Sequence, residues 1–69
     1  MENDVSIKTI KNNHGELIHV KKDNGKIFIL HEDCTNDYIS WENFIKEYVI
    51  SKEEFQIICK TILELIDGK

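Results

Sequence analysis

Residues 17–31 read LIHVKKDNGKIFILH, two apolar-rich segments separated by Asn24-Gly25. A two-residue Asn-Gly loop favours a type I′ turn, because both residues tolerate a positive φ angle. That turn pairs Val20 with Ile29 and so sets the register of the two segments. The sequence therefore predicts a β-hairpin.

This register gives the hairpin two faces, and both are rich in apolar side chains. A small antiparallel sheet normally buries one face and leaves the other to solvent. Here we expect the second face to be covered as well, by a helix of the same chain or by another chain. The first face carries Ile18, Val20, Ile27 and Ile29, and the second carries Leu17, His19, Phe28 and Leu30.

A further strand is expected before the hairpin. Residues 5–9 alternate apolar and polar side chains, as in a half-buried strand, and Ile10 breaks this alternation, which predicts a bulge or a strand end. The segment NNHG that follows is a turn signal. Three strands, over about residues 4–10, 16–22 and 26–32, should form an antiparallel meander.

From Ser40 onwards, apolar residues recur at helical spacing. Ser40 is a good N-cap for a helix over about residues 41–49, and Ser51 with Glu54 predicts a capping box for a second helix over about residues 52–66. The apolar face of the first helix comprises Trp41, Phe44, Ile45, Tyr48 and Val49, and the buried stripe of the second comprises Phe55, Ile58, Cys59, Ile62, Leu63 and Ile66.

The predicted fold class is α+β, a three-stranded antiparallel meander followed by two short helices, in a single domain over residues 1–69. A chain of this size buries only roughly 60% of its unfolded surface. Disulfides, metals or oligomerisation usually support such a domain. Cys34 and Cys59 have no paired spacing and are interpreted as reduced thiols, so we expect a homodimer.

Charge and composition disfavour several classes of protein. The net charge is −4, and the chain has no Arg, the usual reader of phosphates and bases, so nucleic-acid binding is disfavoured. The excess acid lies within residues 32–69. A solvated helix face explains it, and a surface that imitates nucleic-acid phosphate is the alternative. No apolar run approaches the roughly 20 residues of a membrane span, and the acidic start lacks a secretory signal. We therefore expect a cytoplasmic protein without membrane contact.

His31 and Cys34 have a spacing typical of a pair of metal ligands. A structural zinc site needs four ligands, usually as two close pairs, and His14, His19 and Cys59 provide no second pair. A Cys34–His31 or Cys34–His19 pair also lacks a third group to orient it for catalysis. We therefore expect no metal, no cofactor and no enzymatic activity.

Three aromatic residues, Trp41, Phe44 and Tyr48, recur on one face of the first expected helix. Aromatic residues dominate the hot spots of protein interfaces, so we expect this face to bind a partner protein. Glu42 and Glu47 would surround it with negative charge, which mainly raises the association rate. The alternative is that the three rings form the core of the domain.

One series of residues invites a comparison with a known family. It consists of Asp23-Asn24-Gly25-Lys26, then Ser40, Phe44, Tyr48, Ser51, Glu53 and Glu54. The series resembles the short, dimeric, phage-encoded uracil-DNA glycosylase inhibitors. In that family two chains form an acidic DNA mimic, and a pocket between them captures an apolar finger of the glycosylase. The resemblance implies that Phe44 and Tyr48 line this pocket. The family has an acidic residue directly after the Phe, where this chain has Ile45.

The expected function is that of a small, acidic, non-enzymatic protein-binding module. Its narrower form is a phage-type inhibitor of a host uracil-DNA glycosylase, acting by DNA mimicry in the host cytoplasm. The alternative is a structural or regulatory homodimerisation module without inhibitory activity. Salt separates the two, because a DNA mimic binds its enzyme with a strong dependence on ionic strength.

Overall fold

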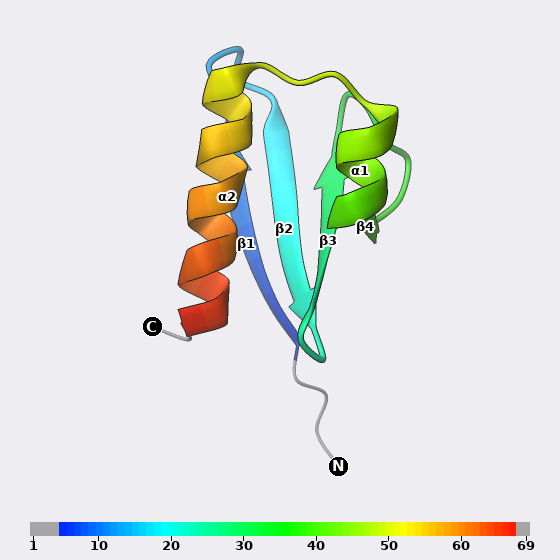
Figure 1. Cartoon of the computed structure of the whole chain (residues 1–69). Coiled ribbons are helices and arrows are strands. Elements are labelled where there is room, and N and C mark those ends of the chain that lie inside the picture. The colour runs from blue at the N-terminus through cyan, green and yellow to red at the C-terminus, as the bar shows by residue number, and fades with distance from the viewer. Residues whose placement is uncertain (1–4, 68–69) are drawn as a thin grey trace.

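The computed structural model describes residues 5–67 and has an α+β fold, with one antiparallel sheet of four strands and two helices (Figure 1). The strands lie across the sheet in sequence order. The α+β class and the meander are confirmed, and the sheet has one strand more than expected. The elements are β1 (Val5–Lys11), β2 (Leu17–Asp23), β3 (Lys26–His31), β4 (Ile39–Ser40), α1 (Trp41–Glu47) and α2 (Lys52–Asp67).

The β2–β3 hairpin has the register that its Asn-Gly loop predicts. Asn24 and Gly25 have φ angles of 54° and 85°, as a type I′ turn requires. Val20 pairs with Ile29. The local sequence therefore predicts the register of the central hairpin.

Strand β4 is the element that was not expected. It contains two residues, which pair with Phe28 and Ile29 of β3, and such a short strand shows no periodicity in sequence. Ser40 ends the strand and also begins α1, because its Oγ accepts a hydrogen bond from the Asn43 N–H at 3.2 Å. The chain thus passes directly from the sheet edge into the first helix.

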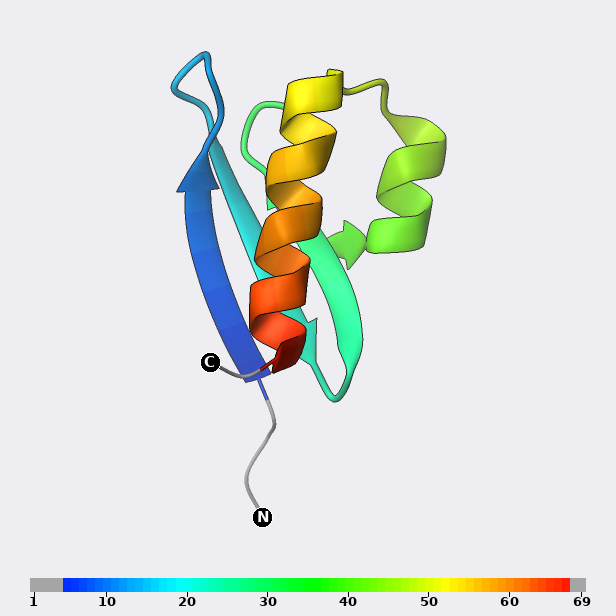
Figure 2. The ribbon, with the colours of Figure 1, turned by 60° about the vertical axis from the view of Figure 1, so that its left-hand side comes forward.

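Both helices lie on the same face of the sheet (Figure 2). On this covered face, Ile18, Val20 and Ile29 have no solvent-exposed surface. They pack with residues of both helices, namely Phe44, Ile58, Ile62 and Leu65. We call the opposite side of the sheet the open face. Its hairpin residues Leu17, His19, Phe28 and Leu30 are half-buried, and neither helix of the described chain covers them.

The apolar side chains Val5 and Ile7 of β1 lie on the open face. Val5 and Ile7 are 41% and 53% exposed, so the expectation of a half-buried β1 with these residues inside is wrong. Ile10 packs against the core instead. The pairing with β2 is regular as far as Lys11, which rules out the expected bulge. The expected first residue of this strand, residue 4, lies outside the described residues.

The helices differ from expectation in length and in rotation. Helix α1 ends at Glu47, because Tyr48 adopts an extended backbone, and Val49 is fully exposed rather than on a helical face. Helix α2 buries a face that includes two polar residues, which the apolar pattern did not count. That face comprises Glu54, Ile58, Thr61, Ile62 and Leu65, whereas Phe55, Leu63 and Ile66 of the expected stripe are exposed.

Candidate functional site

The aromatic residues of α1 stack with Tyr48 and Phe55 in a series that runs from the core to the surface. The Phe44 ring lies 6.1 Å from that of Trp41 and 5.2 Å from that of Tyr48, between ring centroids, and Trp41 lies 5.6 Å from Phe55. Phe44 is completely buried, whereas Trp41 and Tyr48 are half-buried. Phe44 therefore belongs to the core, as the alternative interpretation of this face required.

The other residues expected to bind a partner are at the surface. Glu42 and Glu47 are exposed, and Trp41 and Tyr48 keep part of their rings accessible. Phe44 has no solvent-exposed surface that a partner protein could contact. The five residues thus do not form one continuous aromatic site, and only two of them line the same groove.

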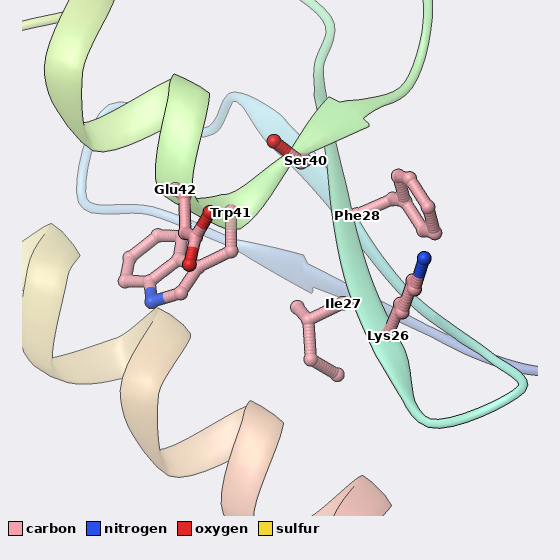
Figure 3. A pocket seen from close by; sticks show the side chains of 6 residues that line it. All are labelled: Lys26, Ile27, Phe28, Ser40, Trp41 and Glu42. Carbon is pink, nitrogen blue, oxygen red and sulfur yellow. The ribbon is translucent and has the colours of Figure 1, made fainter.

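That groove lies at the start of α1, beside the end of β4 (Figure 3). It has a volume of about 460 Å³. Trp41 and Ile27 provide apolar walls, and Lys26 and Glu42 provide one charge of each sign. Its six lining residues are Lys26, Ile27, Phe28, Ser40, Trp41 and Glu42.

The groove contains a free strand edge. A two-residue hairpin loop is flanked by a hydrogen-bonded pair, and the pairs then alternate along the ladder. Lys22 and Ile27 are therefore a non-hydrogen-bonded pair, so the N–H and C=O of Ile27 point away from β2, towards the β4 side. Strand β4 reaches only Phe28 and Ile29. The same alternation makes Phe28 and Ser40 a non-hydrogen-bonded pair, so the Ile27 C=O faces the Trp41 N–H. Within residues 5–67, only the Ile27 N–H lacks a strand partner on that side.

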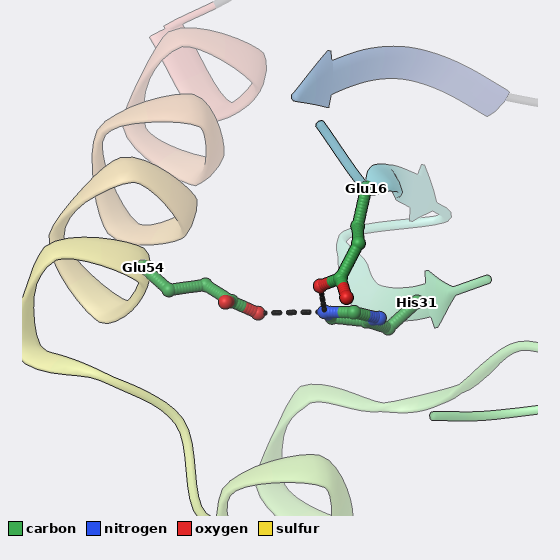
Figure 4. Close-up of side chains that lie close together, drawn as sticks. All are labelled: Glu16, His31 and Glu54. Atoms are coloured by element: carbon green, nitrogen blue, oxygen red, sulfur yellow. Dashed lines mark ion pairs between the residues drawn. The ribbon is translucent and has the colours of Figure 1, made fainter. Parts of the chain in front are cut away.

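A second cluster of functional groups lies beneath the start of α2 (Figure 4). His31 Nε2 lies 2.8 Å from Glu54 Oε2 and 3.7 Å from Glu16 Oε1. Asn12 Nδ2 donates to Glu16 Oε1 at 2.7 Å and to Glu54 Oε1 at 3.2 Å. His31, Glu54 and Asn12 are all buried. The β1–β2 loop, the end of β3 and the start of α2 thus meet at one polar cluster.

The cluster shifts the pKa values of two neighbouring groups, Asp33 and Cys34. A hydrogen bond between the carboxyl groups of Asp33 and Glu16 raises the pKa of Asp33 and lowers the pKa of Glu16. Burial, followed by the nearby carboxylates, raises the pKa of the Cys34 thiol. Cys34 is therefore protonated at neutral pH, and a protonated thiol is a poor nucleophile.

The open face carries a histidine–carboxylate pair of its own. His19 Nε2 lies 2.7 Å from Glu32 Oε2, and His19 Nδ1 lies 2.9 Å from Thr9 Oγ1. Beside this pair, the ammonium group of Lys21 lies 4.2 Å from the centroid of the Tyr38 ring, within the range of a cation–π contact. This face therefore mixes apolar, aromatic and charged groups.

The His31 cluster could not be found from residue spacing. Sequence spacing singled out only His31 and Cys34 as a close pair of ligand types, and no metal was expected there. The structure instead brings His31 next to Glu16 and Glu54, which lie 15 and 23 residues away in sequence. Glu54 was expected to complete a capping box. Only half of that box forms, since Ser51 Oγ accepts from the Glu54 N–H at 3.1 Å while the Glu54 side chain turns to His31.

Comparison of the chain with protein-family models, curated proteins and solved structures finds no significant match. Neither helix of residues 5–67 combines the length and the hydrophobicity needed to cross a membrane. What the chain does must therefore be argued from the groove beside Trp41 and from the His31 cluster.

Proposed function

We propose that the chain is a non-enzymatic protein-binding module, and that it binds an extended segment of a partner protein in the groove beside Trp41. The observation that carries this proposal is the free edge of β3 at Ile27 inside the groove. An extended peptide that lies along this edge would accept a hydrogen bond from the Ile27 N–H. Addition of a strand to an open sheet edge is a recurring mode of peptide recognition.

The side chains around the edge favour such a ligand. Trp41 and Ile27 form an apolar wall beside the free Ile27 N–H, and a half-buried Trp is the type of residue that anchors interfaces. Lys26 and Glu42 provide opposite charges in the same groove. The expected ligand is therefore an extended segment with one apolar side chain against Trp41 and charged residues of both signs beside it.

Selection from a random peptide library tests this proposal. A displayed library is selected on the full chain, and the selected peptides are synthesised with a fluorescent label and titrated with each variant. Trp41→Ala should weaken binding by about 2 kcal/mol, or roughly 30-fold, as for a hot-spot aromatic residue. Circular dichroism of Trp41→Ala checks that the variant is folded.

Leu63→Ala is the matched control. Leu63 is an apolar residue of α2 that is 61% exposed and does not line the groove, so its truncation should leave peptide affinity unchanged. Selected peptides that bind wild type and Trp41→Ala equally well, or that lose affinity with Leu63→Ala, would contradict the proposed site.

Inhibition of a uracil-DNA glycosylase is the second candidate. It is supported by the family resemblance and by the acids Glu42 and Glu47, which are exposed on α1 while Tyr48 keeps accessible ring surface. The burial of Phe44 gives it less support than the groove gives to peptide binding. An excess of the full chain over a bacterial uracil-DNA glycosylase should abolish uracil release from DNA. Unchanged release would remove this candidate.

A further inference from the structure

The cluster beneath α2 assembles three metal-ligand atoms from distant parts of the chain. Glu16, His31 and Glu54 each offer one ligand atom, and these three atoms lie within 4.8 Å of one another. Atoms that share one zinc ion at about 2.0–2.2 Å are roughly 3.0–3.5 Å apart. The His31 Nε2 distances of 2.8 Å to Glu54 and 3.7 Å to Glu16 bracket that spacing, so small side-chain movements suffice for binding.

One of these atoms lacks a hydrogen-bond partner. Glu54 Oε2 is buried, and no described group donates a well-aligned hydrogen bond to it. Its contact with His31 Nε2 at 2.8 Å, an ion pair only when the imidazole is protonated, lacks the alignment of a directed N–H···O bond. The carboxylate points towards His31 Nε2, which the Glu16 carboxylate also faces (Figure 4). A buried carboxylate oxygen left in this state is costly, and a cation would satisfy it.

The charge of the cluster also favours a cation. Two carboxylates face one imidazole, so the three side chains carry a net negative charge even when His31 is protonated. Within residues 5–67, no lysine forms an ion pair with Glu16 or Glu54. A divalent ion would therefore offset charge that the described protein groups leave uncompensated.

Asn12 holds both carboxylates in position. Its Nδ2 group bridges Glu16 and Glu54, and its Oδ1 accepts from the N–H groups of His14 and Glu16. Outer partners of this kind orient metal ligands. Binding through His31 Nε2 requires the ring proton on Nδ1. The Asp33 N–H now contacts Nδ1 at 3.3 Å, and this long contact would be given up.

We propose that Glu16, His31 and Glu54 bind one divalent transition-metal ion, for which Zn²⁺ is the best fit. An imidazole with two carboxylates suits zinc and its first-row neighbours, whereas Mg²⁺ and Ca²⁺ prefer oxygen ligands alone. The ion joins the start of α2 to the end of β3 and to the β1–β2 loop, and so supplies the cross-link that a domain of this size commonly needs. This site is independent of the proposed peptide groove.

Calorimetric titration of Zn²⁺ into the chelator-treated full chain tests the site. Wild type should bind one ion per chain. Glu54→Gln and Glu16→Gln should each lower the affinity by roughly 100-fold or more, since loss of an outer-shell partner alone costs 10–100-fold. Glu53→Gln and His19→Gln are the matched controls, because Glu53 is the exposed neighbour of Glu54 and His19 forms an exposed ion pair. Both should bind Zn²⁺ as wild type does.

Ring-nitrogen NMR spectra of the same samples identify the ligand directly. Addition of Zn²⁺ should shift the His31 Nε2 signal and leave those of His14 and His19 in place. If Glu54→Gln does not fold, Glu16→Gln still tests the metal site, because the Glu16 side chain is 30% exposed and its substitution should not unfold the domain. The proposal is overturned if Glu16→Gln binds Zn²⁺ as tightly as wild type or if the His31 signal does not move. Equal affinity for Mg²⁺ would overturn the choice of metal class.

Discussion

The two faces of the sheet use similar side chains in different ways. On the covered face Ile18, Val20 and Ile29 have lost all contact with solvent, whereas on the open face Leu30 is half-buried and Ile7 is 53% exposed. The alternation of side chains in a strand puts neighbours such as Ile29 and Leu30 on opposite faces. Apolar composition therefore does not predict which face is buried, because the position of the helices decides it.

The two histidine–carboxylate pairs show the same contrast. His31 is buried with Glu54 beneath α2, and His19 is paired with a half-exposed Glu32 on the open face, at nearly equal distances of 2.8 and 2.7 Å. Buried charges interact strongly and are costly to leave unpaired, whereas exposed ion pairs contribute little. The two pairs have nearly equal distances, but we expect the buried pair to contribute more to the free energy of unfolding. Substitution of each histidine measures the difference.

Truncation of neighbouring residues in β3 should give the largest contrast. Ile29→Ala opens a cavity in the core and should lower the free energy of unfolding by about 4 kcal/mol, whereas Leu30→Ala on the open face should cost about 1 kcal/mol. Urea unfolding of both variants measures this. Equal losses would show that the open face is as well packed as the covered face, and the comparison would fail.

Loss of each histidine should separate the two polar pairs. His31→Gln leaves Glu54 buried without its partner and should destabilise the domain by about 3 kcal/mol. His19→Gln removes a pair at the surface and should cost less than about 1 kcal/mol. Both measurements are made by urea unfolding in chelator-treated buffer. A small effect of His31→Gln would show that its contact with Glu54 is not a buried ion pair in solution.

The open face is expected to form the interface of a homodimer. Light scattering at micromolar concentration should return twice the chain mass of 8.1 kDa. Ile7→Glu should weaken the dimer by about 2 kcal/mol, as at an interface hot spot, while Leu63→Glu on α2 should not. A wild-type chain that stays monomeric would contradict this, as would a dimer that Ile7→Glu leaves unchanged.

The smallest effect is expected from the ion pair that ties β1 to α2. Lys8 Nζ lies 2.7 Å from Glu64 Oε1, and this hydrogen bond lowers the pKa of Glu64. A lowered pKa in the folded state stabilises the protein fully above the ordinary Glu pKa, and this contribution disappears as pH falls through the lowered value. The stability difference between wild type and Lys8→Gln should therefore be small at pH 7 and vanish in acid. A difference that persists in acid would have another cause.

The hairpin register and the start of α1 could be predicted, because each depends on residues that are close together in sequence. Asn24-Gly25 fixed the hairpin register, and Ser40 fixed the start of α1. The rotation of α2 was not predictable, because its buried face includes Glu54 and Thr61, whose burial depends on groups elsewhere in the fold. Thr61 Oγ1 is satisfied within the helix by donating to the Ile57 C=O, while Glu54 contacts His31 and Asn12.

The candidate sites were predictable only in part. Trp41 and Glu42 were expected at a binding surface and do line the groove. The burial of Phe44 depends on the docking of α1 against the sheet, which no spacing shows. The free edge at Ile27 arises because β4 is only two residues long. The sequence therefore predicts the residue types at the groove but not the backbone groups that distinguish it.

Amide hydrogen exchange with a selected peptide bound tests the proposed function most directly. The sheet has a second free edge at β1, where the pairing alternation points the N–H of Thr9 away from β2. A peptide that adds a strand beside Trp41 should slow exchange of the Ile27 N–H at least about 10-fold, since a new hydrogen bond must open before exchange occurs, and leave Thr9 unchanged. Protection of Thr9 without protection of Ile27 would contradict the account, because the peptide would then occupy the other edge.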